Sequence, residues 1–208
     1  MKIKTAPNDI ENALFSEGIS PIAGVDEAGR GPLAGPVVAC AIILPHNLII
    51  EGVNDSKKVS EKRREKLSEQ IKNSAISYAY GIILPEEIDQ INILQATLKA
   101  MALAINALNV PPKIALIDGT TSPKLIQNCK LLCVKKGDSA SHLIAAASIL
   151  AKTKRDTIMR ELHEQFPEYA WDKNKGYGTA AHISAIHEHG LSPAHRKSFT
   201  KEFANGYK

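Results

Sequence analysis

The chain has 208 residues, of which 44% are hydrophobic and 23% are charged, and it carries a formal net charge of +4. This length suits one domain with a real core, and the composition is that of an ordinary soluble globular protein. No apolar run is long enough to span a membrane, and the polar start carries no secretory signal, so we expect a cytoplasmic protein without a membrane anchor. The mildly basic charge permits a polyanionic partner but does not require one.

The N-terminal half begins with a polar extension, residues 1–20, that holds a short helix near Ile10 to Phe15. Ile22 to Val25 predict a half-buried strand, and Val37 to Leu44 predict a second strand that is buried on both faces because the run is nearly all apolar. Ser60 is the expected N-cap of a charged helix. A third strand is predicted over Ala75 to Leu84, and Pro85 ends it and starts a helical region.

The C-terminal half alternates helices and strands. Apolar residues recur at helical spacing from Ile91 to Leu108. Two short strands are predicted at Lys113 to Ile117 and Lys130 to Val134, then one long helix from about Ser139 to Phe166. The remaining elements are a loop over Pro167 to Thr179, a helix over Thr179 to His189 and Gly190 as its C-cap. The pattern indicates an α/β domain over residues 21–208, with a mixed sheet and a helical C-terminal segment from about residue 168.

Two adjacent acids, Asp26 and Glu27, lie near the end of the first strand, in an otherwise apolar context. Buried carboxylates without partners are costly, so such acids usually hold a cation, pair with a base or sit at an open rim. Successive side chains of a strand point to opposite faces, so the two acids are expected to converge only if the strand bends. Gly29 and Gly31 permit such a bend, and their spacing does not fit a nucleotide-binding motif.

Two further acids strengthen the hypothesis of a metal site. Asp118 ends an apolar strand, where ligands gather in open α/β sheets. Asp138 is a fourth candidate, although an Asp just ahead of a helix is often only an N-cap. Four acids at one rim would repel each other unless cations lay between them, and hard oxygen ligands favour Mg²⁺ or Mn²⁺ over Zn²⁺. A pair of such ions is a common device for phosphodiester cleavage.

The chain resembles the type 2 ribonucleases H, in particular the bacterial ribonuclease HII family, from about Ile22 to Phe199. The landmarks are GVDEAGRGPLAGPVV, NDSKKVSEKRRE, ALIDG, KGDSASHLIAAASILAKTKRD, NKGYGT and HRKSF. The resemblance implies a ribonuclease H-like mixed β-sheet flanked by helices, with a C-terminal helical segment. It implies an endonuclease that cleaves the RNA strand of RNA–DNA hybrids and cuts 5′ of ribonucleotides embedded in duplex DNA, as in ribonucleotide excision repair, leaving 3′-hydroxyl and 5′-phosphate ends.

The resemblance also implies roles for particular residues. Asp26, Glu27, Asp118 and Asp138 would be the catalytic, metal-binding acids of a two-ion Mg²⁺ or Mn²⁺ site. The segment Gly29-Arg30-Gly31 would read the 2′-hydroxyl of the ribonucleotide. Tyr177 would stack on the sugar of the next nucleotide and favour deoxyribose there. We expect a monomer whose partners are RNA–DNA hybrids and duplex DNA that contains ribonucleotides.

Competing interpretations remain open for the fold and for single residues. The same fold also serves other nucleases, such as resolvases or transposase-like enzymes, and a non-catalytic nucleic-acid-binding module is a different class. Arg30 alone would predict a surface salt bridge, and Tyr177 alone a packed aromatic residue. Histidines at positions 182, 187 and 189 do not share one helical face, so we expect surface or packing roles and no histidine base. Nine basic residues are candidates for phosphate contacts: Lys57, Lys58, Lys152, Lys154, Arg155, Lys173, Lys175, Arg196 and Lys197.

Overall fold

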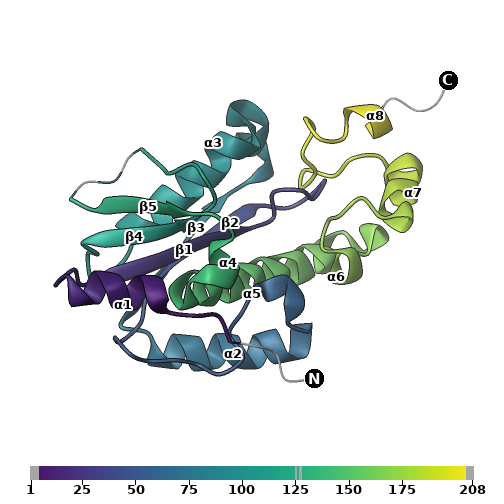
Figure 1. Ribbon diagram of the computed structural model, residues 1–208. Helices are drawn as coiled ribbons and strands as arrows, with labels where there is room; N and C mark the ends of the chain where they lie inside the picture. The colour runs from purple at the N-terminus through teal and green to yellow at the C-terminus, as the bar shows by residue number, and fades with distance from the viewer. Residues whose placement is uncertain (1–4, 125, 127, 205–208) are drawn as a thin grey trace.

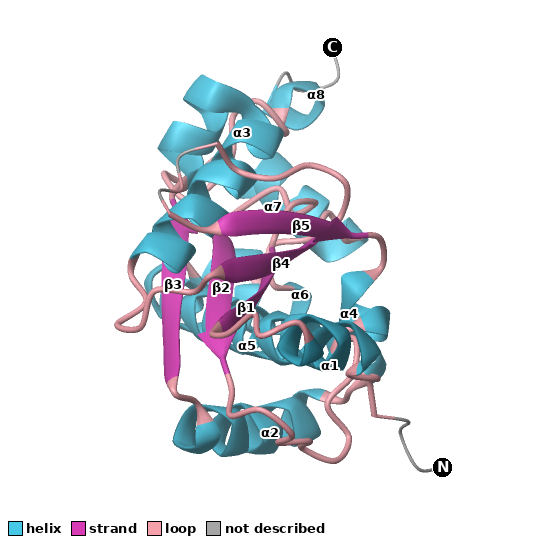
Figure 2. Ribbon diagram, turned by 60° about the vertical axis from the view of Figure 1, so that its left-hand side comes forward, coloured by secondary structure: helices cyan, strands magenta, loops and turns pink. Residues whose placement is uncertain are grey.

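A computed structural model describes residues 5–124, 126 and 128–204, and it places a five-stranded mixed sheet between helices (Figures 1 and 2). The strands are β1 (Ile22–Ala28), β2 (Val37–Ile43), β3 (Ser77–Ile83), β4 (Ile114–Asp118) and β5 (Lys130–Val134). Their order across the sheet is β3-β2-β1-β4-β5. β2 runs antiparallel to β1 and β3, whereas β4 runs parallel to β1 and β5. The expected mixed sheet flanked by helices is confirmed.

The central strand β2 is buried on both faces, as its apolar sequence predicts. Cys40 and Ile42 belong to the core cluster that includes the long helix α5 (His142–Gln165). Ala39, Ala41 and their neighbours of the same parity belong to the cluster that includes helix α3 (Pro85–Asn106). This period of two divides the core into two layers, one on each face of the sheet.

The two core helices approach the sheet closely because glycines leave room for them. A Cβ on Gly24 of β1 would lie 2.3 Å from the backbone of Leu143 in α5. A Cβ on Gly81 of β3 would lie 1.9 Å from the carbonyl oxygen of Ala100 in α3. Real Cβ atoms do not approach backbone so closely, so side chains at these positions would push the helices off the sheet.

The helices largely follow the expected pattern, with two interruptions. They are α1 (Asp9–Ser16), α2 (Glu61–Ser74), α3, α4 (Gly137–Ala140), α5, α6 (Trp171–Asn174), α7 (Ala180–His189) and α8 (Lys201–Ala204), with single 3₁₀ turns at Ser56–Lys58 and Pro167–Tyr169. The single helix predicted from Ser139 to Phe166 is wrong at its start. Ser141 adopts extended backbone angles, and its hydroxyl accepts a hydrogen bond from the N–H of Ile144, so it caps a new helix, α5.

The break in α3 has a similar local cause. Asn92 has a φ of 66° inside the segment, and its side-chain oxygen accepts hydrogen bonds from the N–H groups of Leu94 and Gln95. Asparagine tolerates this left-handed φ and supplies the capping oxygen, so the helix restarts there. Ser60 precedes α2 as expected, but its side chain makes no capping hydrogen bond.

The N-terminal extension packs against the domain through α1. Glu11 is only 7% exposed, and its Oε1 accepts hydrogen bonds from the Ser141 hydroxyl and from the N–H of Leu143. A carboxylate at this end of α5 offsets the partial positive charge of the helix N-terminus. The extension therefore stabilises the start of the helix that lies against β1.

The C-terminal part forms a third cluster beside the end of the sheet where β1 ends (Figure 1). Trp171 is fully buried there, and the Tyr169 ring stacks on it with centroids 5.0 Å apart. Ala34 and Met159 belong to the same cluster, so the turn after β1 and the distal half of α5 share a core with α7. Among the helices that the structure describes, none is long and apolar enough to cross a membrane.

Candidate active site

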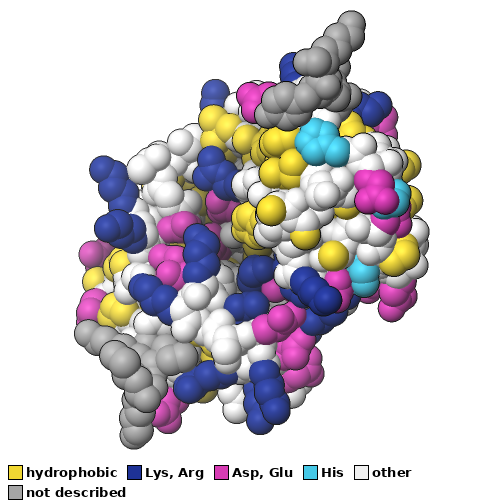
Figure 3. Space-filling model, turned by 90° about the vertical axis from the view of Figure 1, so that its right-hand side faces the viewer, with side chains coloured by type: hydrophobic (Ala, Val, Ile, Leu, Met, Phe, Trp, Pro, Cys, Tyr) yellow, Lys and Arg dark blue, Asp and Glu magenta, His cyan; other side chains and the backbone are white. Residues whose placement is uncertain are grey.

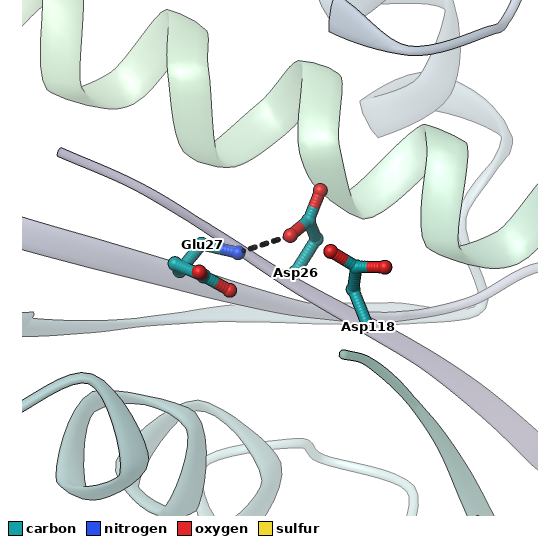
Figure 4. Close-up of side chains that lie close together, drawn as sticks. All are labelled: Asp26, Glu27 and Asp118. Atoms are coloured by element: carbon teal, nitrogen blue, oxygen red, sulfur yellow. Dashed lines mark hydrogen bonds between the residues drawn. The ribbon is translucent and has the colours of Figure 1, made fainter. Parts of the chain in front are cut away.

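The parallel pairing of β1 and β4 brings two of the predicted acids together. Val25 of β1 lies opposite Ile117 of β4, so the next residues, Asp26 and Asp118, are neighbours on the face that α5 covers. Glu27 joins them, and one carboxylate oxygen from each of the three acids lies within 4.8 Å of the others (Figure 4). Residues that are 92 positions apart in the chain thus form one acidic cluster.

The expected bend of β1 at the two acids is not found. The β1–β2 ladder continues through Asp26, Glu27 and Ala28, which pair with Cys40, Ala39 and Val38. The acids can still converge because β4 ends at Asp118, so no strand separates the two faces of the sheet beside Glu27. Asp26 is further held by a hydrogen bond from the backbone N–H of Glu27 to its Oδ1, at 2.7 Å.

The cluster is electrostatically unfavourable without a cation. Burial raises the pKa of Asp26 well above its ordinary value, and the charges of Glu27 and Asp118 raise it further. Burial also raises the pKa of Glu27, while the nearby Arg30 partly lowers it. Like charges disfavour ionisation of their neighbours, so ionised acids at this site store free energy that a bound cation would release.

Asp138 lies beside this cluster but not within it. It is in the first turn of α4, and burial, Asp55 and Asp118 raise its pKa, in that order of importance. The interpretation of Asp138 as an N-cap is wrong, because the residue at that position is Lys136. Asp118 is connected to the same turn, since its Oδ1 accepts a 2.7 Å hydrogen bond from the N–H of Gly137.

The donors of the cluster fit a hard divalent cation. All three ligating groups are carboxylates, and no sulfur or imidazole nitrogen belongs to the group that the described residues form. Oxygen-only ligand sets suit Mg²⁺, Mn²⁺ or Ca²⁺ better than Zn²⁺. Asp26, Glu27 and Asp118 would therefore hold the ion, with Asp138 close enough to the cluster to affect its charge.

All eight residues predicted from the sequence line one open cleft of about 610 Å³. It contains the four acids, the turn from Gly29 to Gly31, and Tyr177. Five further lining residues were not expected from the sequence: Ala28, Ser56, Ile93, Ser148 and Phe199. Figure 3 shows a hollow in this end of the molecule, with acidic side chains inside it and lysines and arginines around it.

One face of α5 supplies the side of the cleft above the acids. Ser148, Lys152 and Arg155 are spaced by four and three residues, so they project from the same side of the helix. The polar Ser148 hydroxyl beside Asp26 lowers the pKa of that carboxyl, and the same hydroxyl hydrogen-bonds that of Ser56 at 3.0 Å. This helical spacing is a signal from which the sequence could have indicated Ser148 beside the predicted Lys152.

Two glycines of the turn after β1 differ in what a side chain would meet. Packing and backbone conformation inside the protein require glycine at position 29, but they do not require it at position 31. Gly29 has a φ of +98°, and a Cβ there would lie 2.2 Å from Nε of Arg155. Gly31 is exposed, and a Cβ there would meet nothing closer than Cε1 of Tyr177 at 3.8 Å. The Arg30 side chain is largely exposed and makes a long 3.5 Å ion pair with Glu27. The Gly31 surface is thus open toward the Tyr177 ring.

Two of the nine candidate phosphate contacts are instead buried inside the protein. Arg155 is 1% exposed and donates hydrogen bonds to the carbonyl oxygens of Ala34, Pro36 and Lys175. Arg196 is fully buried and donates to the carbonyl oxygens of Gly29, Arg30 and Gly35. The expectation of phosphate contacts is wrong for these two, because both guanidinium groups are buried and donate to backbone carbonyl oxygens inside the protein.

Replacing Arg196 with lysine is expected to lower the free energy of unfolding by about 3 kcal/mol, because one ammonium group cannot reach three buried carbonyl oxygens. Urea denaturation measures this change. Arg30→Lys is the matched control, since Arg30 is exposed and its ion pair is long. Equal stability of the two variants would contradict the structural role of Arg196.

Comparisons with known proteins agree with this geometry. The family model described as Ribonuclease HII matches residues 23–202. A Ribonuclease HII from Caldanaerobacter subterraneus subsp. tengcongensis is 52% identical over 196 residues, which cover 94% of this chain and 80% of that protein. The crystal structure of the ribonuclease H2 from Pyrococcus horikoshii OT3 superposes with a TM-score of 0.74 at 27% identity, covering 88% of this chain and 96% of that one.

A more distant structure shares the fold. The crystal structure of Bst-RNase HIII in complex with Mn²⁺ has a TM-score of 0.61, covers 89% of this chain and 70% of that one, and is 16% identical. At this identity the likeness shows a shared fold alone.

Proposed function

Since this chain belongs to the ribonuclease HII family and is therefore a ribonuclease H, we propose that it hydrolyses the RNA strand of RNA–DNA hybrids and cuts 5′ of ribonucleotides embedded in duplex DNA. The observation that carries this proposal is the convergence of Asp26, Glu27 and Asp118 in a cleft that Gly31 and Tyr177 also line. Acids that can hold a cation thus face groups that can contact a nucleotide. We further propose that the enzyme acts as a cytoplasmic monomer.

The four acids have the catalytic and metal-binding role in this proposal. Two divalent ions, Mg²⁺ or Mn²⁺, would when bound supply an activated water and a charge that stabilises the leaving oxygen. Asp26, Glu27 and Asp118 hold the cations, and Asp138 adds negative charge beside them. The Ser148 hydroxyl beside Asp26 favours the ionised form of that carboxylate. Lys57 and Lys152, which line the same cleft, offer positive charge to a phosphate of the scissile strand.

The turn and Tyr177 select the nucleotide. Without a side chain at Gly31, backbone groups of Gly29-Arg30-Gly31 can approach a ribose closely and meet its 2′-hydroxyl, the group that distinguishes RNA from DNA. Tyr177 is 44% exposed and lines the same cleft, so its ring is free to stack on the sugar of the following nucleotide. A ribonucleotide followed by a deoxyribonucleotide is then the favoured substrate.

The ends of the products test the chemistry. Attack by water in line with the 3′ oxygen leaves a 3′-hydroxyl on one fragment and a 5′-phosphate on the other. Attack by the neighbouring 2′-hydroxyl would instead leave a 2′,3′-cyclic phosphate. We expect a duplex with one embedded ribonucleotide, incubated with the protein and Mg²⁺, to be cut on the 5′ side of that ribonucleotide, with 3′-hydroxyl and 5′-phosphate ends seen by mass spectrometry.

Two controls separate the competing functions. Equal cutting of an all-DNA duplex would favour a resolvase-like or transposase-like nuclease, which has no need of a 2′-hydroxyl reader. Tight binding of the hybrid without cleavage in any divalent metal would favour a non-catalytic binding module. The three converging acids argue against that module, because uncompensated carboxylates weaken phosphate binding.

A further inference from the structure

Two buried histidines lie directly behind Tyr177, in a part of the chain that the proposed chemistry does not use. His182 is in α7, and His195 lies in the segment that follows this helix. His182 is fully buried and His195 is 2% exposed, which agrees with the expectation of a packing role for His182. Their Nε2 atoms are 3.1 Å apart. Buried imidazoles in direct contact require a defined arrangement of protons.

The neighbours of the two rings determine where the protons are. Nδ1 of His182 lies 2.9 Å from the carbonyl oxygen of Tyr177, which only accepts, so Nδ1 carries a proton. Nε2 of His182 accepts the indole N–H of Trp171 at 3.0 Å, so it carries none. Nδ1 of His195 accepts the backbone N–H of Ser192 at 3.0 Å, so the proton of His195 is on Nε2 and points at His182.

Both rings are therefore neutral, and each donates one hydrogen bond to the next group in the same series. The hydrogen bonds run from Ser192 to His195, from His195 to His182, and from His182 to the carbonyl oxygen of Tyr177. A second proton on His182 would be on Nε2, where it would point at two N–H donors, the Trp171 indole and the His195 imidazole, and find no acceptor there. Burial lowers the pKa of both histidines, to about 4 for His195, which keeps them neutral at physiological pH.

This series of hydrogen bonds ends at the backbone carbonyl oxygen of Tyr177, whose side chain lines the proposed substrate cleft. The Tyr177 carbonyl oxygen also accepts the N–H of Thr179 at 2.8 Å, and the Tyr177 N–H donates to the carbonyl oxygen of Asn174 at 3.0 Å. The backbone of Tyr177 is thus fixed on both sides while its ring stays partly exposed. The other end of the series lies against the glycine turn, because His195 forms a β-bridge with Ala34.

We propose that His182, oriented by His195, is a positioning residue that fixes Tyr177 relative to Gly31 and thereby sets the preference for a ribonucleotide followed by a deoxyribonucleotide. This inference rests on the proposed function of Tyr177 as the residue that stacks on the second sugar. His182 touches neither substrate nor metal in this proposal. Its contribution is the direction of one N–H group, the Nδ1–H that holds the Tyr177 carbonyl oxygen.

Amide substitutions separate the hydrogen bond from the mere filling of space. The amide nitrogen of asparagine can take the place of Nδ1 and still donate to Tyr177, whereas glutamine puts its amide near the position of Nε2. The measured quantity is the ratio of kcat/KM for a duplex with one embedded ribonucleotide to kcat/KM for a uniform RNA–DNA hybrid. We expect His182→Gln to lower this ratio about tenfold, near the effect of Tyr177→Ala, and His182→Asn to retain most of it.

Two controls test whether His182 acts through Tyr177. In a Tyr177→Ala background, His182→Gln is expected to change the ratio no further, because there is no ring left to position. His187→Gln replaces an exposed histidine of the same helix and is expected to keep the wild-type ratio. Circular dichroism identifies folded variants, and His195→Gln supplies a second test if His182→Gln does not fold.

The outcomes that overturn the proposal are distinct from those that overturn the function. A folded His182→Gln variant with the wild-type ratio, or one whose effect persists without Tyr177, refutes the positioning role. A wild-type protein that cuts no ribonucleotide-containing duplex refutes the proposed function. The ¹⁵N chemical shifts of the imidazole rings test this series of hydrogen bonds without an activity assay. An Nε2–H tautomer of His182, or a charged His182 at pH 7.5, would overturn the proposal.

Discussion

Asp118→Asn is expected to lower cleavage in Mg²⁺ by about a thousandfold or more while the fold is retained, since a cation at such a site supplies several kcal/mol of transition-state stabilisation. Asparagine keeps an oxygen that can accept the N–H of Gly137, so the local hydrogen bond survives. Only the negative charge and one anionic oxygen of the cluster are lost. Single-turnover cleavage of a duplex with one ribonucleotide measures the effect.

The same substitution is expected to stabilise the metal-free protein. The pKa of Asp26 is raised above its value in the unfolded chain by burial, Glu27 and Asp118. Stability from such a group is present below the unfolded pKa and is lost as the pH rises through the folded pKa. At pH 8 in EDTA the ionised cluster therefore costs free energy, and Asp118→Asn removes one of the repelling charges. Its Tm should exceed that of the wild type in EDTA and rise less when Mg²⁺ is added.

Asp9→Asn is the matched control, because Asp9 is an exposed acid of α1, outside the cleft. It should leave cleavage and the response of Tm to Mg²⁺ unchanged. Cleavage by Asp118→Asn at the wild-type rate would refute the assignment of the cluster as the metal site. A lower Tm of that variant in EDTA would show that the carboxylate supports the fold instead of opposing it.

Gly31→Ala is expected to raise KM or lower kcat/KM by about 10- to 100-fold without a loss of stability, since an added methyl group in a close contact costs about 1–3 kcal/mol. Inside the protein a Cβ at this position has room, since its nearest neighbour would be Cε1 of Tyr177 at 3.8 Å. The room inside the protein therefore makes this variant a test of the proposed contact with the ribose.

Gly29→Ala serves as the comparison, because here the expected loss is in stability. Its φ of +98° and the overlap of a Cβ with Arg155 and the Pro36 carbonyl oxygen predict a destabilised protein. Thermal unfolding and steady-state kinetics of both variants on the same substrate distinguish the two reasons for glycine. A Gly31→Ala variant with unchanged kinetics would mean that no substrate group comes close to the turn.

Much of the architecture followed from local patterns. The apolar run from Val37 predicted a strand buried on both faces, and the structure places β2 at the centre of the three-stranded antiparallel part of the sheet. The acids at the ends of two apolar strands could also be identified from the sequence, because charged residues are unusual beside a run of buried apolar residues. The spacing of Ser148 and Lys152 on one helical face was equally readable.

Other features depended on partners that are distant in the chain. The register between β1 and β4 decided that Asp118 lies beside Asp26, and nothing near either residue in the sequence specifies it. Arg155 and Arg196 read as surface charges, yet they bind carbonyl oxygens about 120 and 160 residues away in the chain. Ser141, which caps α5, likewise has a distant partner, since Glu11 accepts from its hydroxyl across 130 residues.

The sequence by itself determined the order of the elements, the apolar faces and the presence of acids at strand ends. These properties depend on the periodicity of each segment, which is local. Only the tertiary structure decided which acids share a cation-sized space, which arginines are buried and how the histidines behind Tyr177 are protonated. Such properties depend on which donor meets which acceptor, and packing between distant segments determines those pairs.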